Sequence, residues 1–448
     1  MPPAQTGYSL RTFVRGLVAL LLLAGSAAGC GDAGELASLP VTAVALEAGV
    51  DVHYAAPALR PRHGYEPVIA DFDGDGRRDF FLGGHAFSAG LSRRYPIADR
   101  VFLYRDGGYQ PAPTALPPGQ DRHGCAAADL VGDACLDLFC VAGAERGAGG
   151  HDNELWEGDC RGGFTPVPGF GAEYPTGRSR LARALDLDGD GDRDLVASVF
   201  GEREDAQPNA TSLFRNDGAA GFTRIDSCLS AQAGSRCLAT PDLDGDGRDD
   251  IVACAARQGV DAYVELAGDR CRTFPVFAEP RRWQALAMAP LASGEGDSFV
   301  GATTLDEAPT VVVLQGLGVE PGAGAVAYRS GFRLALGAAF AACRVHSLAL
   351  GDLTADGVAE LVLTLVDAAD PAARCRPAAE LLLLGPTFRR AVALDSGPHR
   401  GPTFAAILNG QALRSGAQPG SPGVVDLASL PRGWPAARAA IDQRVPSP

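Results

Sequence analysis

The sequence contains no lysine, so arginine supplies all 39 of its basic residues. Aspartate and glutamate together number 54, which gives the chain a formal net charge of −15. An excess of negative charge leaves little to neutralise phosphates, and it therefore argues against nucleic-acid binding. We attribute the absence of lysine itself to GC-biased codon usage rather than to function.

Long hydrophobic runs are also missing, apart from one run of 13 residues at positions 17–29. A run of this length is too short for a transmembrane helix, and the arginines before it make it typical of a signal peptide. Its end, Ala-Ala-Gly-Cys at positions 27–30, resembles a bacterial lipobox. The resemblance implies a lipoprotein signal peptide over residues 1–29 and lipid attachment at Cys30. The alternative is ordinary secretion with cleavage nearby.

The rest of the chain divides into three parts. Residues 30–40 are typical of a short tether, and residues 431–448 of a loosely ordered tail. The chain has 57 glycines and 32 prolines, which suits a folded domain of many short strands and turns over residues 41–430. We expect an exported protein that is anchored in the cell envelope by its lipid alone, at a bacterial outer membrane or cell surface.

Ten of the 11 cysteines follow Cys30. An even number in an exported chain favours disulfides, and the absence of any Cys-x-x-Cys argues against zinc. We expect local bridges, because Cys228 and Cys237 flank one short loop and Cys254 and Cys271 lie within one repeat. Cys343 and Cys375 likewise share a repeat. Three pairings stay open for the other four: Cys125, Cys135, Cys140 and Cys160.

One pattern, Asp-x-Asp-Gly-Asp-Gly-x-x-Asp, recurs along the chain. We number six copies as loops 1 to 6, at residues 71–79, 129–137, 186–194, 242–250, 290–298 and 352–360. Loops 1, 3 and 4 are complete, loops 2 and 6 are partial, and loop 5 has lost its ligands. Carboxylates this close repel one another unless a hard cation lies between them. The glycines at positions four and six let the backbone turn around such an ion.

Aspartates at alternate positions of a tight loop converge on one point, and calcium takes six to eight oxygen ligands. We therefore expect three to five calcium sites, formed by side chains at positions one, three, five and nine and the carbonyl of position seven. The complete sites are Asp71, Asp73, Asp75, Arg77 and Asp79; Asp186, Asp188, Asp190, Asp192 and Asp194; and Asp242, Asp244, Asp246, Arg248 and Asp250. The partial sites are Asp352, Thr354, Asp356 and Glu360, and Asp129, Asp133 and Asp137.

Three alternatives to calcium loops of this kind have to be weighed. Magnesium fits less well, because it prefers fewer protein ligands and retains its water. An EF-hand needs a glutamate at position 12 and flanking helices, whereas loop 1 has Leu82 there and its flanks are rich in β-forming residues. The third alternative is that the loops are acidic turns that bind nothing, and it is strongest for loop 2.

The loops start at intervals of 58, 57, 56, about 48 and about 62 residues, each between two short apolar strands. A third strand and an aromatic-bearing fourth follow, and a four-stranded unit of this period fits a blade of a β-propeller. These features resemble the FG-GAP/VCBS repeat family over residues 60–392, as in the integrin α-subunit propeller. The resemblance implies an all-β propeller, commonly of seven blades. Residues 400–430 would begin a seventh blade, and residues 41–55 would close the ring.

Motifs of catalysis are also missing: there is no Gly-x-Ser-x-Gly, His-Glu-x-x-His or phosphate loop. We therefore expect no enzyme, but a calcium-stabilised surface module that binds an unknown surface protein or glycan. A polysaccharide lyase or hydrolase on the same scaffold, or a subunit of a larger envelope assembly, are the alternatives. His63, His123 and His399 lie near blade entrances and would meet at the central mouth, although loop packing explains them more simply.

Overall fold

The structure is a computed structural model, and all of its described secondary structure consists of β-strands and three short 3-10 helices. It describes residues 41–44, 49–56, 67–82, 99–106, 108–117, 122–142, 152–173, 179–199, 211–231, 235–255, 259–264, 266, 271–277, 283–292, 296–305, 308–319, 325–336, 338–352, 357–370, 373–376, 378, 380–384, 388, 390–394, 403–408, 411–419 and 426–430. The 3-10 helices are η2 (Gly218–Ala220), η3 (Cys228–Ala231) and η4 (Ala338–Phe340). Cys30 and the tether lie outside these residues.

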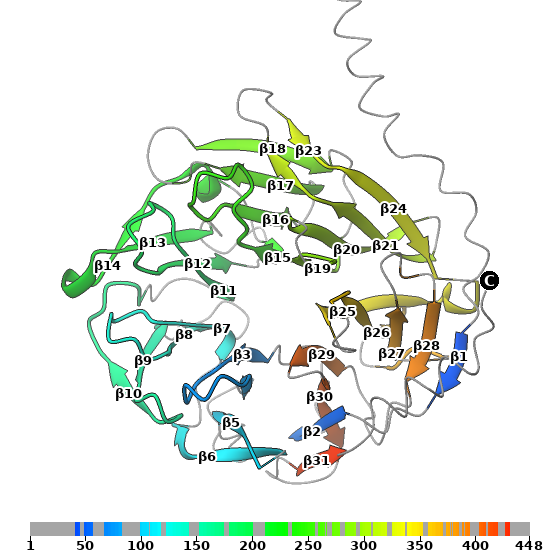
Figure 1. The fold of residues 1–448 in the computed structure, drawn as a ribbon, viewed down its shortest axis with the longest axis horizontal. Coiled ribbons are helices and arrows are strands. Elements are labelled where there is room, and N and C mark those ends of the chain that lie inside the picture. The colour runs from blue at the N-terminus through cyan, green and yellow to red at the C-terminus, as the bar shows by residue number, and fades with distance from the viewer. Residues whose placement is uncertain are drawn as a thin grey trace, which may run out of the picture.

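Five sheets of four antiparallel strands, which we call blades 1 to 5, follow one another around a ring (Figure 1). Blade 1 contains β3 (Val68–Ala70), β4 (Asp79–Leu82), β5 (Asp99–Arg105) and β6 (Gly108–Leu116). Blade 2 contains β7 (Arg122–Ala128), β8 (Asp137–Ala142), β9 (Glu154–Gly158) and β10 (Phe164–Val167). Blade 3 contains β11 (Ser179–Leu185), β12 (Asp194–Val199), β13 (Ser212–Asn216) and β14 (Phe222–Ile225).

Blades 4 and 5 continue the same order of strands. Blade 4 contains β15 (Ser235–Ala239), β16 (Ile251–Ala255), β17 (Gly259–Val264) and β18 (Arg272–Phe277). Blade 5 contains β19 (Ala285–Ala289), β20 (Ser298–Leu305), β21 (Ala308–Gln315) and β24 (Ser330–Ala335). Between its last two strands lies a two-stranded sheet of β22 (Gly318–Val319) and β23 (Val326–Ala327). The protein is therefore an all-β propeller, as the repeat predicts.

Two further sheets lie between blade 5 and blade 1 in Figure 1, and each contains one strand from near the N-terminus. The sixth sheet consists of β25 (Cys343–Gly351), β26 (Glu360–Asp367), β27 (Glu380–Leu384), β28 (Arg390–Leu394) and β1 (Val41–Val44). The seventh sheet consists of β29 (Thr403–Leu408), β30 (Gln411–Pro419), β2 (Gly49–Ala56) and β31 (Asp426–Leu430). β2 pairs in parallel with β30 and antiparallel with β31. The expected pairing of the N-terminal stretch with C-terminal strands is confirmed.

The hydrophobic core is divided into clusters that each lie between two neighbouring sheets. Phe139 of blade 2 and Phe214 of blade 3 belong to one such cluster, and both are almost completely buried. Trp283 and Phe299 of blade 5 pack against Val252 of blade 4 in another. A blade thus buries its faces only against its neighbours, so closure of the ring contributes to the stability of every sheet.

Five disulfides connect the ten described cysteines. Cys343–Cys375 agrees with the expected local bridge. The other local expectation was wrong, because Cys228 pairs with Cys271 and Cys237 with Cys254. Antiparallel pairing of β15 with β16 brings Cys237 and Cys254 close. Cys271 stands directly before β18 and bonds to Cys228 in η3. The four open cysteines form Cys125–Cys140 and Cys135–Cys160.

The described part of the chain contains no helix of the length and hydrophobicity that crossing a bilayer requires.

Removing the two N-terminal strands tests their role in the sixth and seventh sheets. β2 lies between β30 and β31, and β31 joins the seventh sheet through β2. Deletion of residues 41–56 is therefore expected to lower the melting temperature by roughly 5 °C or more, because several kcal/mol of pairing and packing are lost. Calorimetry measures the change, and deletion of residues 1–40 alone is the control. Equal melting of the two deletions would contradict the closure.

Candidate metal centres

The Asp-rich loops lie where the repeat predicts them, between the first and second strands of the sheets. Loops 1, 3 and 4 connect β3 to β4, β11 to β12 and β15 to β16. Loop 5 connects β19 to β20, and loop 6 connects β25 to β26. The first and second strands pair antiparallel, so each loop connects their ends at the point where the chain reverses direction.

The backbone of these loops favours glycine at its fourth and sixth positions, although Ala134 takes the sixth position of loop 2 at φ 68°. Gly74 and Gly76 of loop 1 have φ angles of 72° and 85°, in the left-handed region that other residues avoid. The aspartate at position one stabilises this curl by accepting backbone N–H bonds. In loop 1, Asp71 accepts from the N–H of Asp75 at 3.1 Å and from that of Gly76 at 2.8 Å. The curl is therefore built into the chain before any ion binds.

The aspartate at position nine is buried and ties its loop to the third strand of the blade. In loop 1, Asp79 accepts from the N–H of Phe72 at 2.9 Å and from that of Tyr104 at 2.7 Å. In loop 3, Asp194 accepts in the same way from Leu187 and Asn216, both at 2.7 Å. The position-nine residue is fully buried in loops 1, 2 and 3. This carboxylate thus holds loop, second strand and third strand together.

Burial shifts the protonation of these carboxylates. It raises the pKa of Asp79 and of Asp194 to about 6, and that of Asp250 in loop 4 to about 7. Burial is the largest cause of these pKa shifts; the neighbouring aspartates contribute to the rise, and the backbone N–H donors oppose it. A buried carboxylate in an acidic loop therefore gains from a nearby positive charge, which a proton or a metal ion supplies.

The predicted ligands come together in the three complete loops. One ligand atom from each of three aspartates lies within 4.8 Å of the others in each loop. The three groups are Asp71, Asp73 and Asp79; Asp186, Asp188 and Asp194; and Asp242, Asp244 and Asp246. The buried Oδ1 of Asp73 has no hydrogen-bond partner among the described residues. A carboxylate oxygen left in this state fits a site for a cation, so these loops could bind metal ions.

The remaining predicted ligands do not belong to these three groups. Three predicted ligands, Asp75, Asp190 and Asp250, lie outside the groups of their own loops. Asp75 and Asp190 each accept the N–H of the residue two positions on, and Asp250 accepts that of Leu243.

In loop 6, Thr354 and Asp356 lie outside the described residues. Asp352 accepts the N–H of Gly357 at 2.8 Å, and Glu360 is buried, as at position nine elsewhere. The contribution of the position-seven carbonyls stays a prediction.

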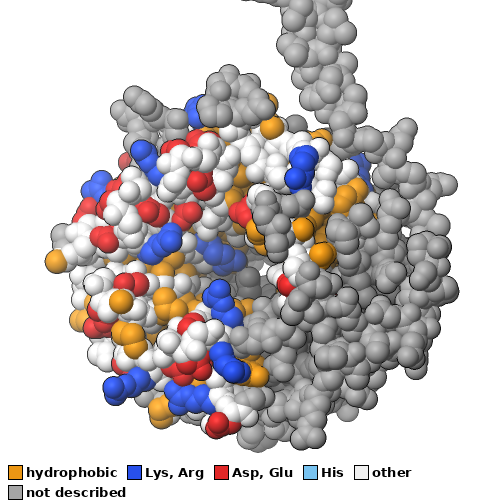
Figure 2. Space-filling model, in the orientation of Figure 1, with side chains coloured by type: hydrophobic (Ala, Val, Ile, Leu, Met, Phe, Trp, Pro, Cys, Tyr) orange, Lys and Arg blue, Asp and Glu red, His pale blue; other side chains and the backbone are white. Residues whose placement is uncertain are grey.

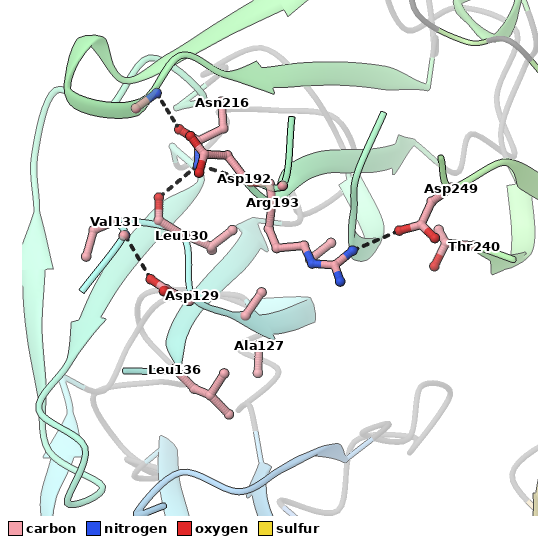
Figure 3. Close-up of a pocket in the computed structure, with 15 residues that line it drawn as sticks. Ala127, Asp129, Leu130, Val131, Leu136, Asp192, Arg193, Asn216, Thr240 and Asp249 are labelled. Carbon is pink, nitrogen blue, oxygen red and sulfur yellow. Dashed lines mark hydrogen bonds and ion pairs between the residues drawn. The ribbon is translucent and has the colours of Figure 1, made fainter. Parts of the chain in front are cut away.

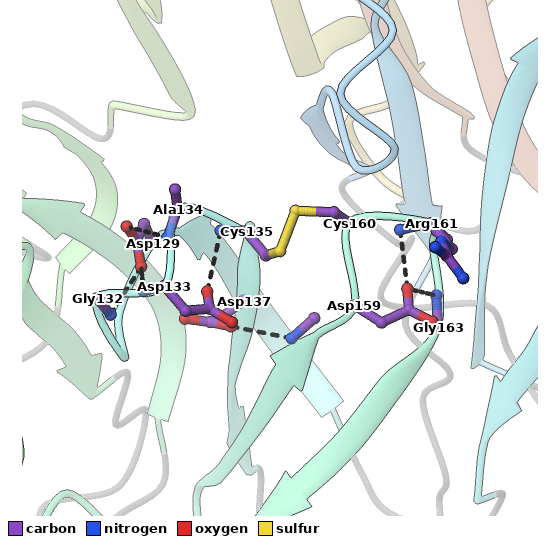
Figure 4. The surroundings of a disulfide bond; sticks show 11 residues. Asp129, Gly132, Asp133, Ala134, Cys135, Asp137, Asp159, Cys160, Arg161 and Gly163 are labelled. Atoms are coloured by element: carbon purple, nitrogen blue, oxygen red, sulfur yellow. Dashed lines mark hydrogen bonds between the residues drawn. A yellow bond between two sulfur atoms is a disulfide. The ribbon is translucent and has the colours of Figure 1, made fainter.

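Loop 2 keeps the curl but is fastened by a disulfide (Figure 4). Asp129 accepts three backbone N–H bonds from within the loop, and Asp137 accepts three more. Position three is Val131, and the loop is absent from the groups of clustered ligands among the described residues. Cys135 at position seven is bonded to Cys160 in the turn before β10. A covalent bond therefore connects this loop to the rest of its blade.

Three charged side chains that the repeat motif does not reveal also fasten the loops. Arg105 at the end of β5 donates to Asp73 at 2.8 Å and 3.1 Å. Asp249, at the variable eighth position of loop 4, accepts from the N–H of Asp186 at 2.8 Å and from Arg193 at 2.9 Å. Loops 3 and 4 are thereby joined. The variable positions of the motif carry no signal for such contacts, because their partners lie in other repeats.

A cavity of about 580 Å³ opens between loops 2, 3 and 4 (Figure 3). Its lining includes Asp129 and Val131 of loop 2, Arg193 of loop 3 and Asp249 of loop 4. Asn216 lies in its wall and donates to the carbonyl of Leu130 at 3.0 Å, which joins two blades beneath the cavity. Among the described residues, Val131 is the only large hydrophobic side chain that is exposed, at 41%.

Comparison with known proteins identifies the repeat. Residues 71–140 and 186–253 match the family model of the FG-GAP-like repeat. No curated protein matches the chain. Among solved structures, the chain is similar to one in a mercury-soaked crystal structure of BBS1N in complex with ARL6DN. That match has 12% identity and a TM-score of 0.46, and it covers 88% of this chain and 98% of the other. The protein is a β-propeller, and the matched residues in blades 1 to 4 are FG-GAP-like repeats.

Substitution at two positions of loop 3 separates the structural role from ion binding. Asp194→Ala leaves the N–H groups of Leu187 and Asn216 without their acceptor, which costs about 1–3 kcal/mol for each buried group. We expect a lower melting temperature in EDTA. Asp190→Ala is the matched control, because its side chain is exposed and accepts only the N–H of Asp192 among the described residues. Equal melting of the two variants in EDTA would refute the role of Asp194.

The raised pKa values predict how pH affects stabilisation by a divalent cation. A carboxyl group whose folded pKa lies above its ordinary value of 3.8 is stabilised by its proton, and this contribution is lost as pH rises through about 6 to 7. At higher pH a bound cation supplies the positive charge that the proton on this carboxyl group supplies at lower pH. The gain in melting temperature on adding the cation should therefore grow between about pH 5.5 and pH 8.

Comparing melts with and without the cation also controls for the titration of His346. Burial and the nearby Arg344 lower the pKa of His346 to about 4, so this histidine destabilises the fold as pH falls below its unfolded value. His346 lies in β25 and belongs to none of the clustered ligand groups. We expect it to contribute equally with and without the cation, so the difference between the two melts removes its effect. A gain that is constant or falls with pH would contradict the assignment.

Proposed function

We propose that this protein is a seven-bladed, calcium-stabilised propeller that binds a protein or glycan partner outside the cytoplasm and has no catalytic activity. The observation that carries the proposal is the cavity between loops 2, 3 and 4. Charged and amide side chains line it beside an exposed valine, a combination typical of recognition surfaces. The loops that form its walls are those that ions and a disulfide would fix in position.

Calcium is the cation that these loops suit best. Their donors are carboxylate oxygens, three of which already converge in each complete loop. Calcium accepts six to eight oxygen ligands in flexible geometry, so the position-five carboxylate and the position-seven carbonyl would complete the shell with water. Closing such a loop without a cation leaves several negative charges together. Ion binding would therefore stabilise the fold where free calcium is plentiful, as it is outside the cell.

The seven-bladed ring is supported by the two sheets beyond blade 5. The sixth sheet repeats the order of first to fourth strand in β25, β26, β27 and β28. The seventh sheet takes β2 from the N-terminal side of the chain and places it between β30 and β31. A last blade that combines both ends of the chain closes a propeller by strand pairing rather than by side-chain packing alone.

The place of action is supported by the disulfides. Five bridges within one chain suggest a protein outside the reducing cytoplasm. The lipobox-like end of the leader then suggests lipid attachment at Cys30. Residues 30–40 would give the propeller a tether at the membrane surface. Metabolic labelling with a fatty acid, compared between the natural chain and Cys30→Ser, tests the anchor.

A calcium titration tests the ion sites. We expect at least three sites in the protein after treatment with EDTA, and a rise in melting temperature as they fill. Asp188→Asn should remove one site, because it takes a carboxylate from the centre of loop 3. Asp133→Asn in loop 2 is the matched control and should leave the number of sites unchanged. A protein that melts identically in calcium and EDTA would refute calcium stabilisation.

A binding assay tests the cavity. A glycan array and immobilised envelope proteins supply partners, and Val131→Asp should weaken a specific partner roughly tenfold or more, because it places a charge at an exposed apolar contact. Thr165→Asp, at an exposed position of β10, is the matched control. A partner that binds both variants alike does not use the cavity. Turnover of a bound glycan would contradict the absence of catalysis.

A further inference from the structure

Loops 3 and 4 are joined by two hydrogen bonds between one residue of each loop. Asp249, at position eight of loop 4, accepts the N–H of Asp186 on its carboxylate at 2.8 Å. The N–H of Asp249 donates to the carbonyl of Asp186, also at 2.8 Å. Asp186 is position one of loop 3 and one of its three clustered carboxylates. Both backbone polar groups of a predicted ion ligand are therefore held by the neighbouring loop.

Two arginines extend this contact in both directions. Arg193 of loop 3 donates to the carboxylate of Asp249 at 2.9 Å (Figure 3). Arg248 of loop 4 lies against the backbone of loop 3, because a Cβ on Gly189 would be 3.3 Å from its Cγ. On the face shown in Figure 2, arginine side chains likewise lie among the acidic ones rather than apart from them. Each loop therefore contacts the other through an arginine as well as through Asp249.

The backbone part of this contact recurs between loops 5 and 6, but the side-chain part does not. Ala359, at position eight of loop 6, donates its N–H to the carbonyl of Leu291 in loop 5 at 2.9 Å. Alanine has no polar side chain, and loop 5 has lost its ligands. Neighbouring loops thus lie within reach of each other in both places. Loop 4 adds to this contact a carboxylate that reaches an ion ligand of the preceding loop.

The bonds between Asp249 and Asp186 matter more than the ion pair with Arg193. The side chain of Arg193 is 48% exposed and that of Asp249 25%, and an ion pair between such side chains contributes little. A bond from an N–H group to a charged carboxylate is stronger than one between neutral groups. The bonds also fix the chain on both sides of the Asp186 side chain. Asp249 therefore acts on the position of Asp186 and touches no ion itself.

Asp249 is in turn placed by the loop that contains it. It stands between Arg248 and Asp250, the predicted ligands at positions seven and nine of loop 4. Asp250 is buried, accepts the N–H of Leu243 at 2.8 Å and donates its own N–H to the carbonyl of Pro241 at 2.7 Å. An ion in loop 4 would hold the chain on each side of Asp249. The order that an ion gives loop 4 thus reaches the first ligand of loop 3 through one residue.

We propose that loops 3 and 4 bind their cations with positive cooperativity, and that Asp249 is the positioning residue that couples them. This inference rests on the calcium binding proposed above. The first ion orders a residue on which the other loop depends, so the second ion has less disorder to remove. Repulsion between the two ions opposes the gain, but salt screens it because much of both loops is exposed. We expect each ion to raise the affinity for the other roughly fivefold or more.

A luminescent probe reports on loop 3 separately from the other loops. Asp192→Trp places an indole at position seven of loop 3, where the side chain is exposed and the backbone carbonyl is the predicted ligand. Terbium takes oxygen ligands as calcium does, and it luminesces when a nearby indole is excited. The signal that the natural chain gives with its own three tryptophans is subtracted. Competition with calcium then measures the calcium affinity of loop 3 in the full chain.

Substitutions of Asp249 in this chain test its role as the coupling residue. Asp249→Ala removes the acceptor of the Asp186 N–H and should weaken loop 3 roughly fivefold or more, although it takes no predicted ligand from either loop. Asp249→Asn keeps an oxygen acceptor and should restore most of the affinity. Asp297→Ala is the matched control, because it changes the same motif position in loop 5, and it should leave loop 3 unchanged.

Emptying loop 4 separates coupling from simple support of loop 3. Asp244→Asn takes a carboxylate from the loop 4 group and should weaken loop 3 by a similar factor, because loop 4 no longer fills. Asp73→Asn is the matched comparison: it takes the equivalent carboxylate from loop 1, two blades away, and should leave loop 3 as it is. In the double variant Asp249→Ala, Asp244→Asn the two losses should not add, because one residue transmits what the other initiates.

The possible results lead to different conclusions. Loop 3 that binds calcium equally well or better in Asp244→Asn would overturn the coupling and leave calcium stabilisation intact. Losses that add in the double variant would also overturn it, since Asp249 would then support loop 3 whether or not loop 4 is filled. Terbium that gives no signal from loop 3, or that calcium does not displace, would overturn both proposals. The asparagine variants keep the size of the side chain, so the comparison stands even where Asp249→Ala does not fold.

Discussion

A buried carboxylate at the ninth position of five of the six loops is the interaction on which the rest of the structure depends. Asp79 and Asp194 each accept one N–H from their own loop and one from the third strand of their blade. One side chain thereby fixes the loop against both strands that follow it. The same burial raises its pKa, because a charge removed from water is unfavourable unless an opposite charge is near. Blade geometry and affinity for a cation are thus two results of one buried charge.

Blade 2 shows that the loop can be fastened in another way. Asp137 keeps the buried position and its N–H donors, but Val131 removes one carboxylate from the point where the others would meet. The bond between Cys135 and Cys160 connects the loop to the turn before β10, which an ion inside the loop does not reach. The disulfide keeps the loop attached to its blade, although the loop lacks the carboxylate at position three that would help to bind an ion. A disulfide in loop 2 and clustered carboxylates in the complete loops are therefore two ways to hold a loop against its blade.

The sequence predicted the periodic part of the fold and little of what joins the repeats. Regular spacing of the loops was enough to locate the first and second strands, since each loop marks a reversal between apolar stretches. The pairing of Cys228 with Cys271 could not be predicted, because it depends on where β18 passes η3 in space. The contact of Asp249 with Asp186 and Arg193 was missed for the same reason. Variable positions of a repeat acquire a role only when another repeat lies beside them.

The net charge of −15 is a poor guide to what the surface offers a ligand. Much of the negative charge lies in the loops, where buried positions and convergent carboxylates call for cations. The first strands of the sheets, free of acidic residues in their described parts, carry arginine and histidine instead. Residues of opposite charge are therefore separated along the repeats of loops 2, 3, 4 and 6, with carboxylates in the loop and basic residues in the strand before it. The net charge of the chain therefore averages over two kinds of region and describes neither of them.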